Sequence, residues 1–250
     1  MKPDPSMDRL LDATARAERD HFWFRGFRRF VRPLLDRAAA GRNDLLILDA
    51  GCGTGHNLGL LAPYGRAIGI DITLSGLARA HRAGRRSVAQ ASVTHLPFPA
   101  ATFDLLTSFD VIYALHDREE GMAIAEMARV LRPGGTLVLN VAALPVLRGN
   151  HSVLGGEVRR YTRRLLSDHL RRGGFEIQRL TYTNAAILPL VAGVRFTQRL
   201  TGHRHSDREI TAPAAPINSA LSAALALEAI ALRLVNMPLG SSLLALAVRR

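Results

Sequence analysis

One segment constrains this chain more than any other: a run of apolar residues that ends in a carboxylate and continues into three closely spaced glycines. Residues 45–49 read Leu-Leu-Ile-Leu-Asp, and Gly51, Gly53 and Gly55 follow. A short apolar run bounded by glycines is typical of a buried strand. Because glycine adopts positive φ and admits a ligand close to the backbone, the pattern predicts a strand, a ligand-binding turn and a helix.

The rest of the chain continues the alternation of strands and helices. A second apolar segment, residues 67–72, contains Asp71 and completes a β-α-β unit. Further strands are predicted at residues 103–109, 136–141, 175–182 and 242–248, and helices at residues 119–131 and 163–172. This order indicates an α/β fold with a doubly wound, mostly parallel sheet, whose ligands bind at the carboxyl ends of the strands. We therefore expect the site in the loops after Asp49, Asp71 and Asp110.

Two adenosine-containing ligands compete for the glycine-rich turn. A dinucleotide fingerprint, G-x-G-x-x-G, needs its third glycine at position 56, where His56 stands, whereas the glycine is Gly55. The observed spacing favours S-adenosylmethionine, whose carboxylate can meet backbone N–H groups while Asp49 offsets its positive charge. At the end of the next strand, Asp71 is placed to accept hydrogen bonds from both ribose hydroxyls, a device that both ligand classes use.

In these residues and several further motifs, the chain resembles the class I S-adenosylmethionine-dependent methyltransferase superfamily, and within it the bacterial type 11 branch, over roughly residues 18–183. The matching motifs are Leu48-Asp49-Ala50-Gly51-Cys52-Gly53-Thr54-Gly55, Gly69-Ile70-Asp71, Leu96-Pro97-Phe98-Pro99, Phe103-Asp104-Leu105, Phe109-Asp110-Val111 and Leu131-Arg132-Pro133-Gly134-Gly135. The resemblance implies a seven-stranded, Rossmann-like methyltransferase sheet, S-adenosyl-L-methionine as cofactor and S-adenosyl-L-homocysteine as product.

The resemblance also implies which residues hold the cofactor. Ser92 stands where the family usually has aspartate, so the adenine contact lacks charge assistance. Tyr113-Ala114 stand where the family usually has Glu-His, which leaves open which residue acts as a base. His21 and Arg25, in an N-terminal segment, are expected to fold over the cofactor, although the aromatic residues around them would equally suit packing on the sheet. The full expected set is Asp49, Gly51, Gly53, Gly55, Asn57, Asp71, Ile72, Ser92, Val93, Phe109, Asp110, His21 and Arg25.

Methyl transfer from a sulfonium is an in-line displacement, so alignment and exclusion of water are the main tasks of the protein. A base is needed only where the acceptor must lose a proton. The candidates are His151, in the loop after the fifth strand, and then His116 and Tyr113, each of which would equally suit a surface or packing role. Cys52 is the only cysteine, so no metal site is expected and a reducing cytoplasm fits the composition.

The predicted organisation has four parts: an N-terminal helical lid (1–41), the cofactor-binding core (42–183), a helical insertion (184–240) and a final strand (241–250). The insertion contains a helix-like run, residues 218–236, that is apolar around much of its circumference and must be covered. Packing on its own domain, a homodimer contact, a substrate cap or peripheral contact with a membrane would each cover it. No apolar stretch is long enough to predict a membrane span.

The net charge of +12 raises the question of a nucleic-acid partner. Lys2 is the only lysine, and the arginines are spread along the chain, which favours a solvated surface over a nucleic-acid interface. We therefore expect transfer to a small molecule, with oxygen as the acceptor atom and specialised metabolism as the setting. A nucleic-acid methyltransferase and an S-adenosylmethionine-binding protein without methyl transfer are the alternatives; Asp110-Val111-Ile112-Tyr113 lacks the two prolines of base-methylating enzymes.

Overall fold

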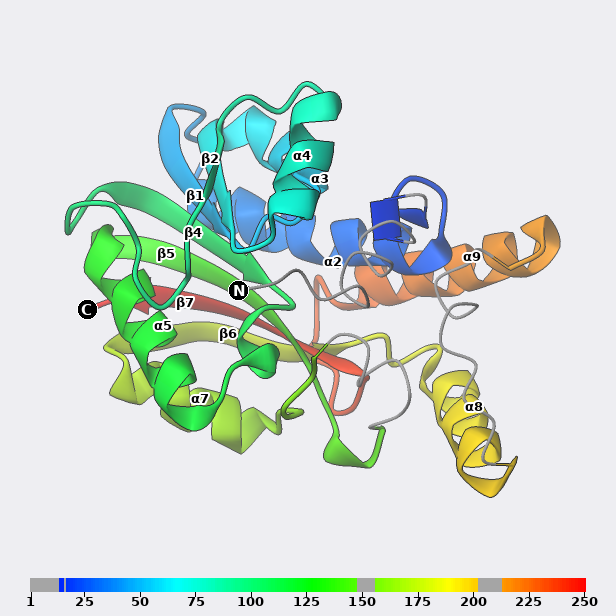
Figure 1. Cartoon of the computed structure of the whole chain (residues 1–250). Helices are drawn as coiled ribbons and strands as arrows, with labels where there is room; N and C mark the ends of the chain where they lie inside the picture. Colours follow the sequence, from blue (N-terminus) through cyan, green and yellow to red (C-terminus); the bar gives the residue numbers. More distant parts are fainter. Residues whose placement is uncertain (1–13, 16, 148–155, 202–212) are drawn as a thin grey trace.

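The structure is a computed structural model that describes residues 14–15, 17–147, 156–201 and 213–250. Seven strands in these residues form one sheet in the order β3-β2-β1-β4-β5-β7-β6 (Figure 1). Strands β1 to β5 pair in parallel, and β7 pairs antiparallel with both β5 and β6. The bounds are β1 Leu45–Ala50, β2 Gly65–Asp71, β3 Val88–Gln90, β4 Phe103–Phe109, β5 Leu131–Ala142, β6 Phe175–Thr183 and β7 Ser242–Arg249. The predicted doubly wound, mostly parallel seven-stranded sheet is confirmed.

Helices cover both faces of this sheet. Neighbouring strand residues such as Ile47 and Leu48 point to opposite faces and belong to two separate apolar clusters. One cluster includes residues of α5 and α7, and the other includes residues of α2, α3 and α9. The helices are α2 Phe22–Ala39, α3 His56–Leu61, α4 Leu74–Arg82, α5 Asp117–Val130, α7 Arg163–Arg172, α8 Leu188–Thr201 and α9 Ala215–Ala231, with short 3₁₀ helices at Ala62–Tyr64, Ile112–Ala114 and Pro145–Leu147.

Several elements differ from the sequence prediction; strand β5, for example, begins at Leu131 instead of residue 136. Strand β3 was not predicted, because it is three residues long and largely exposed and so has no apolar pattern. Helix α5 begins at Asp117, since His116 and Glu119 form a capping box there. Helix α9 covers Ala215–Ala231 rather than residues 218–236, and the residues after it form turns.

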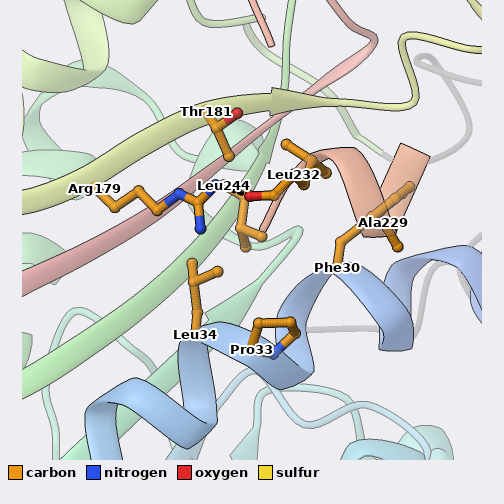
Figure 2. A pocket seen from close by; sticks show the side chains of 8 residues that line it. All are labelled: Phe30, Pro33, Leu34, Arg179, Thr181, Ala229, Leu232 and Leu244. Atoms are coloured by element: carbon orange, nitrogen blue, oxygen red, sulfur yellow. Dashed lines mark hydrogen bonds between the residues drawn. The ribbon is translucent and has the colours of Figure 1, made fainter. Parts of the chain in front are cut away.

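The end of α9 is held by a side chain from the sheet. Arg179 of β6 donates to the carbonyl oxygens of Leu232 and Val235 and to Asn236 Oδ1 (2.9 Å). Figure 2 shows Arg179 beside Leu232, in a small hollow lined also by residues of α2 and β7. A cation at the carbonyl end of a helix satisfies acceptors that the helix leaves unpaired. Among the described residues, no helix combines the length and apolar character needed to cross a membrane.

Helix α2 packs against α9 and also contacts strands β5 and β7. Its buried side chains include Phe30, Val31, Leu34 and Leu35. Phe22 and Trp23, near its start, pack partly buried against the same apolar cluster. The division of the chain into lid, core and insertion stays a prediction.

Candidate functional site

The glycine-rich turn after β1 needs glycine at its first position for two reasons. Gly51 has φ +90°, in the left-handed region that other residues rarely adopt. A Cβ at this position would also lie 2.2 Å from Cγ2 of Val111, in the loop after β4. The backbone of the turn therefore packs directly against the loop that follows the neighbouring strand.

Asp49, the last polar residue of β1, is 1% exposed and only partly satisfied. Its Oδ1 accepts a hydrogen bond from Thr107 Oγ1 at 2.7 Å, whereas Oδ2 has no partner among the described residues. Burial raises the pKa of Asp49 to about 7, with a smaller rise from the charge of Asp71. A buried carboxylate oxygen without a donor favours a cationic ligand, and the sulfonium and ammonium of S-adenosylmethionine are cations of that kind.

Asp71 connects two loops of the site. Its Oδ2 accepts from the backbone N–H of Gly53 (2.8 Å), and its Oδ1 accepts from the N–H and hydroxyl of Thr73 (2.8 and 2.5 Å). The sequence pattern predicted that Asp71 accepts hydrogen bonds from the ribose hydroxyls, and it did not predict this contact with the glycine-rich turn. Because a carboxylate oxygen can accept two hydrogen bonds, Oδ2 retains capacity for a ribose hydroxyl.

The segment expected at the adenine edge follows β3. Ser92 Oγ lies 2.8 Å from Thr94 Oγ1 and accepts from the N–H of Thr94, so it serves first as the start of a local turn. Val93 is 8% exposed and belongs to the apolar core. The neighbouring Ile72, by contrast, is 53% exposed after β2.

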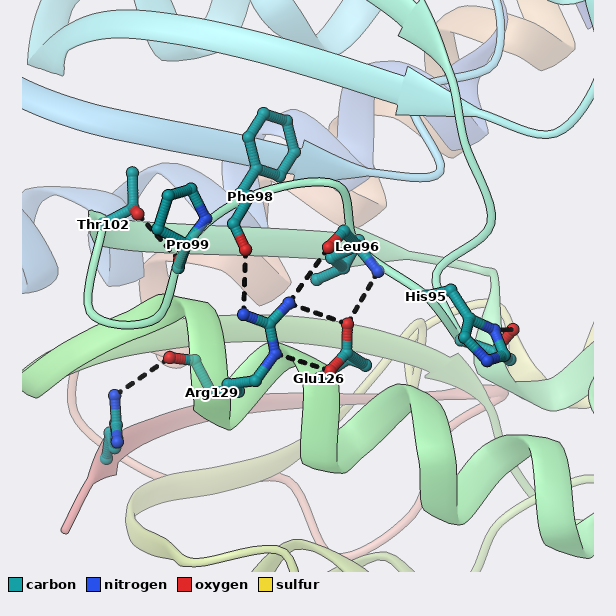
Figure 3. A network of polar contacts seen from close by, with 9 residues as sticks. His95, Leu96, Phe98, Pro99, Thr102, Glu126 and Arg129 are labelled. Atoms are coloured by element: carbon teal, nitrogen blue, oxygen red, sulfur yellow. Dashed lines mark hydrogen bonds and ion pairs between the residues drawn. The ribbon is translucent and has the colours of Figure 1, made fainter.

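Two side chains of α5 hold the loop that continues from this segment. Figure 3 shows the guanidinium of Arg129 between the carbonyl oxygens of Leu96 (3.0 Å) and Phe98 (2.8 Å). Glu126 pairs with Arg129 at 2.6 Å and accepts from the N–H of Leu96 at 2.7 Å. Sequence reasoning missed both residues, because no local pattern connects a helix residue to a loop thirty positions earlier.

The loop after β4 lies on the other side of the turn. Phe109 is 8% exposed and packs edge-on against Phe27 of α2, with ring centroids 5.0 Å apart. Asp110 adopts φ +61° and accepts from Asn140 Nδ2 of β5 at 2.9 Å. An aspartate held in the left-handed region by a neighbouring strand is a strained position of the kind found at functional sites.

A second charged group lies near Asp110. Arg160 and Glu157 form a bidentate ion pair, with 2.7 and 3.0 Å between their atoms, and Arg160 also donates to the carbonyl of Ala143. The charges of Asp110 and Glu157, after burial, raise the pKa of Tyr113, which keeps the phenol protonated. Of these residues, Asp110 and Tyr113 were predicted site residues.

The three base candidates differ in their surroundings. Tyr113 is half-buried and protonated, which suits a hydrogen-bond donor better than a base. His116 is exposed and forms the N-cap of α5, where its backbone N–H donates to Glu119 at 3.2 Å. His151 lies outside the described residues. None of the three roles is tested by these contacts, so they stay predictions.

The segment before α2 reaches the glycine-rich turn. Thr54 Oγ1 donates to the carboxylate of Glu18, with 2.8 and 2.9 Å to its two oxygens. His21 is 6% exposed and caps α2 by accepting from the N–H of Trp23, whereas Arg25 is exposed. Asn57 lies on α3 and is half-buried. Within the described residues, no cluster of three metal-ligating side chains occurs.

Comparison with known proteins matches this arrangement to one family. A model of the methyltransferase domain matches residues 48–139. A probable S-adenosylmethionine-dependent methyltransferase from Mycolicibacterium smegmatis is 33% identical over 123 residues, which are 48% of this chain and 46% of that protein. An uncharacterised protein of Methanocaldococcus jannaschii is 30% identical over 172 residues, 58% of this chain and 66% of that protein. The chain thus spans less than half the length of the first relative.

A solved structure shares the fold. An S-adenosylmethionine-dependent methyltransferase from Mesorhizobium loti superposes with a TM-score of 0.55 at 20% identity, covering 87% of this chain and 96% of that one. The fold, the matched domain and the glycine-rich turn lead to the same assignment. Residues 48–139 therefore match a methyltransferase domain, and part of the chain is similar to S-adenosylmethionine-dependent methyltransferases.

Proposed function

We propose that this chain transfers the methyl group of S-adenosyl-L-methionine to a small-molecule acceptor. The proposal rests above all on Asp49, a buried carboxylate with one unpaired oxygen next to the glycine-rich turn. S-adenosylmethionine, when bound, supplies a methyl group that is already activated on a positively charged sulfur. Asp49 stabilises that positive charge, and the N–H groups of the turn bind the carboxylate.

The remaining cofactor contacts follow from the positions of the loops. Asp71 binds the ribose through the free capacity of Oδ2 and keeps the turn in place through Gly53. Val93 and the loop held by Arg129 border the adenine, where Ser92 offers a neutral acceptor in place of a carboxylate. Phe109 and Asp110 border the methionine side, and Glu18 holds the preceding segment over Thr54.

Oxygen is the acceptor atom that these side chains suit best. Asp110 presents a carboxylate that accepts a hydrogen bond from a hydroxyl group and attracts its proton as the methyl group transfers. The protonated Tyr113 donates a hydrogen bond that orients the acceptor. We place this reaction in cytoplasmic specialised metabolism.

Calorimetric titration with S-adenosylmethionine, S-adenosylhomocysteine and NADH tests the cofactor assignment. We expect micromolar binding of both adenosyl ligands, none of NADH, and about tenfold weaker binding after Asp71→Ala. The matched control is Asp104→Asn, since Asp104 is paired with Arg132 (2.8 Å) at the opposite end of β4. NADH binding without adenosyl binding would overturn the proposal.

Transfer of a radiolabelled methyl group to a panel of hydroxyl, amine and carbon acceptors tests the substrate class. Product analysis by mass spectrometry and NMR identifies the methylated atom. We expect a methyl ether or ester, and a kcat reduced about tenfold or more by Tyr113→Phe with unchanged cofactor affinity. Methylation at nitrogen or carbon would refute the choice of oxygen, and cofactor binding without transfer would refute the enzymatic role.

A further inference from the structure

Helix α9 packs one stripe of residues against the protein and leaves the opposite stripe uncovered. Ser222, Leu225, Ala229 and Leu232 are buried, at spacings of three, four and three residues. The exposed positions Ala220, Ala223, Leu227, Ile230 and Leu234 repeat at spacings of three and four. Because such spacings follow one face of a helix, the two sets lie on opposite sides of α9 and of the turn that extends it.

The uncovered stripe is strongly apolar. Leu227 is 68% exposed, Ile230 60% and Leu234 87%. Val235 and Leu239, in the segment after α9, are 55% and 53% exposed. We call these five residues the α9 patch. Neighbouring apolar side chains with this exposure are uncommon on monomeric proteins and mark surfaces that contact a partner.

Positive charge lies beside the α9 patch. Arg233 is exposed between Ile230 and Leu234, and Arg29 of α2 is exposed while donating to the carbonyl of Ser222 at 3.0 Å. Glu228 is the only acidic residue in residues 213–250. It is 5% exposed and accepts from the N–H groups of Ala185 and Ala186, so its charge is directed away from solvent.

The covered side of the helix is occupied by other parts of the protein. Figure 2 shows Arg179, Leu232 and Ala229 together there. The opposite side combines an apolar stripe with the exposed Arg233 beside it, on a chain of net charge +12.

From this combination we infer that the α9 patch binds an anionic lipid surface peripherally. Leucine, isoleucine and valine side chains enter the boundary between headgroups and acyl chains, while Arg233 and Arg29 attract the phosphates. A second copy of this chain fits the patch less well, because a symmetric contact would bring the same arginines together. The contact would place the methyltransferase domain beside acceptors that reside in or near a membrane.

Vesicle co-sedimentation of the full chain tests the inference. The vesicles are pure phosphatidylcholine, or phosphatidylcholine with about one-third phosphatidylglycerol. We expect binding to the anionic vesicles, a decrease in about 0.5 M salt, and little binding to the neutral ones. The triple variant Leu227→Ser, Ile230→Ser and Leu234→Ser should lower the partition coefficient about tenfold or more, and Arg233→Gln about fivefold.

The matched control is Leu74→Ser on α4, which changes a leucine that is equally exposed (66%) but lies outside the patch. It should bind vesicles like the unchanged protein. Circular dichroism and cofactor titration show whether each variant is folded. Equal binding of the triple variant, or equal binding to neutral vesicles, would overturn the inference. So would light scattering that finds a dimer which the triple variant converts to a monomer, because the patch would then be a self-interface.

Discussion

Replacing Asp49 by asparagine should stabilise the cofactor-free protein while weakening its cofactor binding. The carboxylate is 1% exposed, and one of its oxygens lacks a hydrogen-bond donor among the described residues. Asparagine has nearly the same shape and no charge. The substitution therefore separates the energetic cost of burying the charge from the benefit of the charge in binding a cation.

The magnitude follows from the pKa. Burial raises the pKa of Asp49 from 3.8 to about 7, so between these values the folded protein holds a proton that the unfolded chain has lost. Stability consequently falls as pH rises through this window, and the loss is complete above pH 7, with a ceiling of about 4 kcal/mol. Weaker hydrogen bonding of asparagine to Thr107 and an unpaired amide offset about half. A net gain of about 2 kcal/mol corresponds to a Tm higher by about 4 to 8 °C above pH 7.

Thermal unfolding of both proteins from pH 5 to pH 8.5 is the assay. The advantage of Asp49→Asn should be present at pH 8.5 and shrink as the pH falls toward the unfolded pKa. Asp104→Asn is the control, because Asp104 is ion-paired with Arg42 and Arg132 and its charge stabilises the fold. That variant should have an unchanged or lower Tm at every pH. A Tm for Asp49→Asn that is lowered equally at all pH values would refute the reasoning.

Calorimetry supplies the second half of the test. S-adenosylmethionine should bind Asp49→Asn about tenfold or more weakly, since a charge-assisted interaction is lost. For the unchanged protein, the affinity should rise about tenfold between pH 6 and pH 8, because the cation pairs with the ionised form of Asp49. An affinity that does not depend on pH would show that the cofactor does not depend on this carboxylate.

Two further predictions concern stability. Gly51→Ala should lower the Tm by several degrees, at a cost of about 3 kcal/mol in stability, because the new Cβ clashes with Val111 in addition to the backbone strain. The control is Gly84→Ala, which has φ +79° and open space around the new Cβ and should cost only about 1 to 2 kcal/mol. Equal losses in the two variants would contradict the steric argument. Glu120→Gln should destabilise by about 3 kcal/mol in denaturant titration, because the 1% exposed carboxylate of Glu120 pairs with Arg159 (2.7 Å) and accepts from Tyr161, and its loss leaves Arg159 only the exposed Asp117. The exposed Glu119→Gln should change stability by less than about 0.5 kcal/mol.

Local sequence patterns determined the fold class and the position of the first turn. The apolar run at residues 45–49 and the spacing of Gly51, Gly53 and Gly55 predicted β1 and the turn, because hydrophobic periodicity and glycine geometry act within a few residues. The antiparallel place of β7 between β5 and β6 could not be derived from the strand pattern of residues 242–248 alone. The resemblance implied a seven-stranded, mostly parallel sheet and did not specify this strand order.

Long-range contacts determined the rest of the site. Thr107 of β4 donates to Asp49 on the neighbouring strand β1, and Glu18 accepts from Thr54, which lies 36 residues later in the sequence. No spacing rule relates such residues, since their proximity depends on how the strands are ordered and how helices pack on them. The same holds for Arg129, whose contact with the loop at Leu96 required the position of α5.

The apolar residues of α9 illustrate the division between the two sources of information. Their composition alone predicted a helix that must be covered, as the run at residues 218–236 indicated. Only the packing of α2 against Leu225 and Leu232 decided which side is covered and which side, with Leu227 and Ile230, faces solvent. A sequence specifies the polarity of each residue, whereas burial depends on which surface another part of the chain occupies.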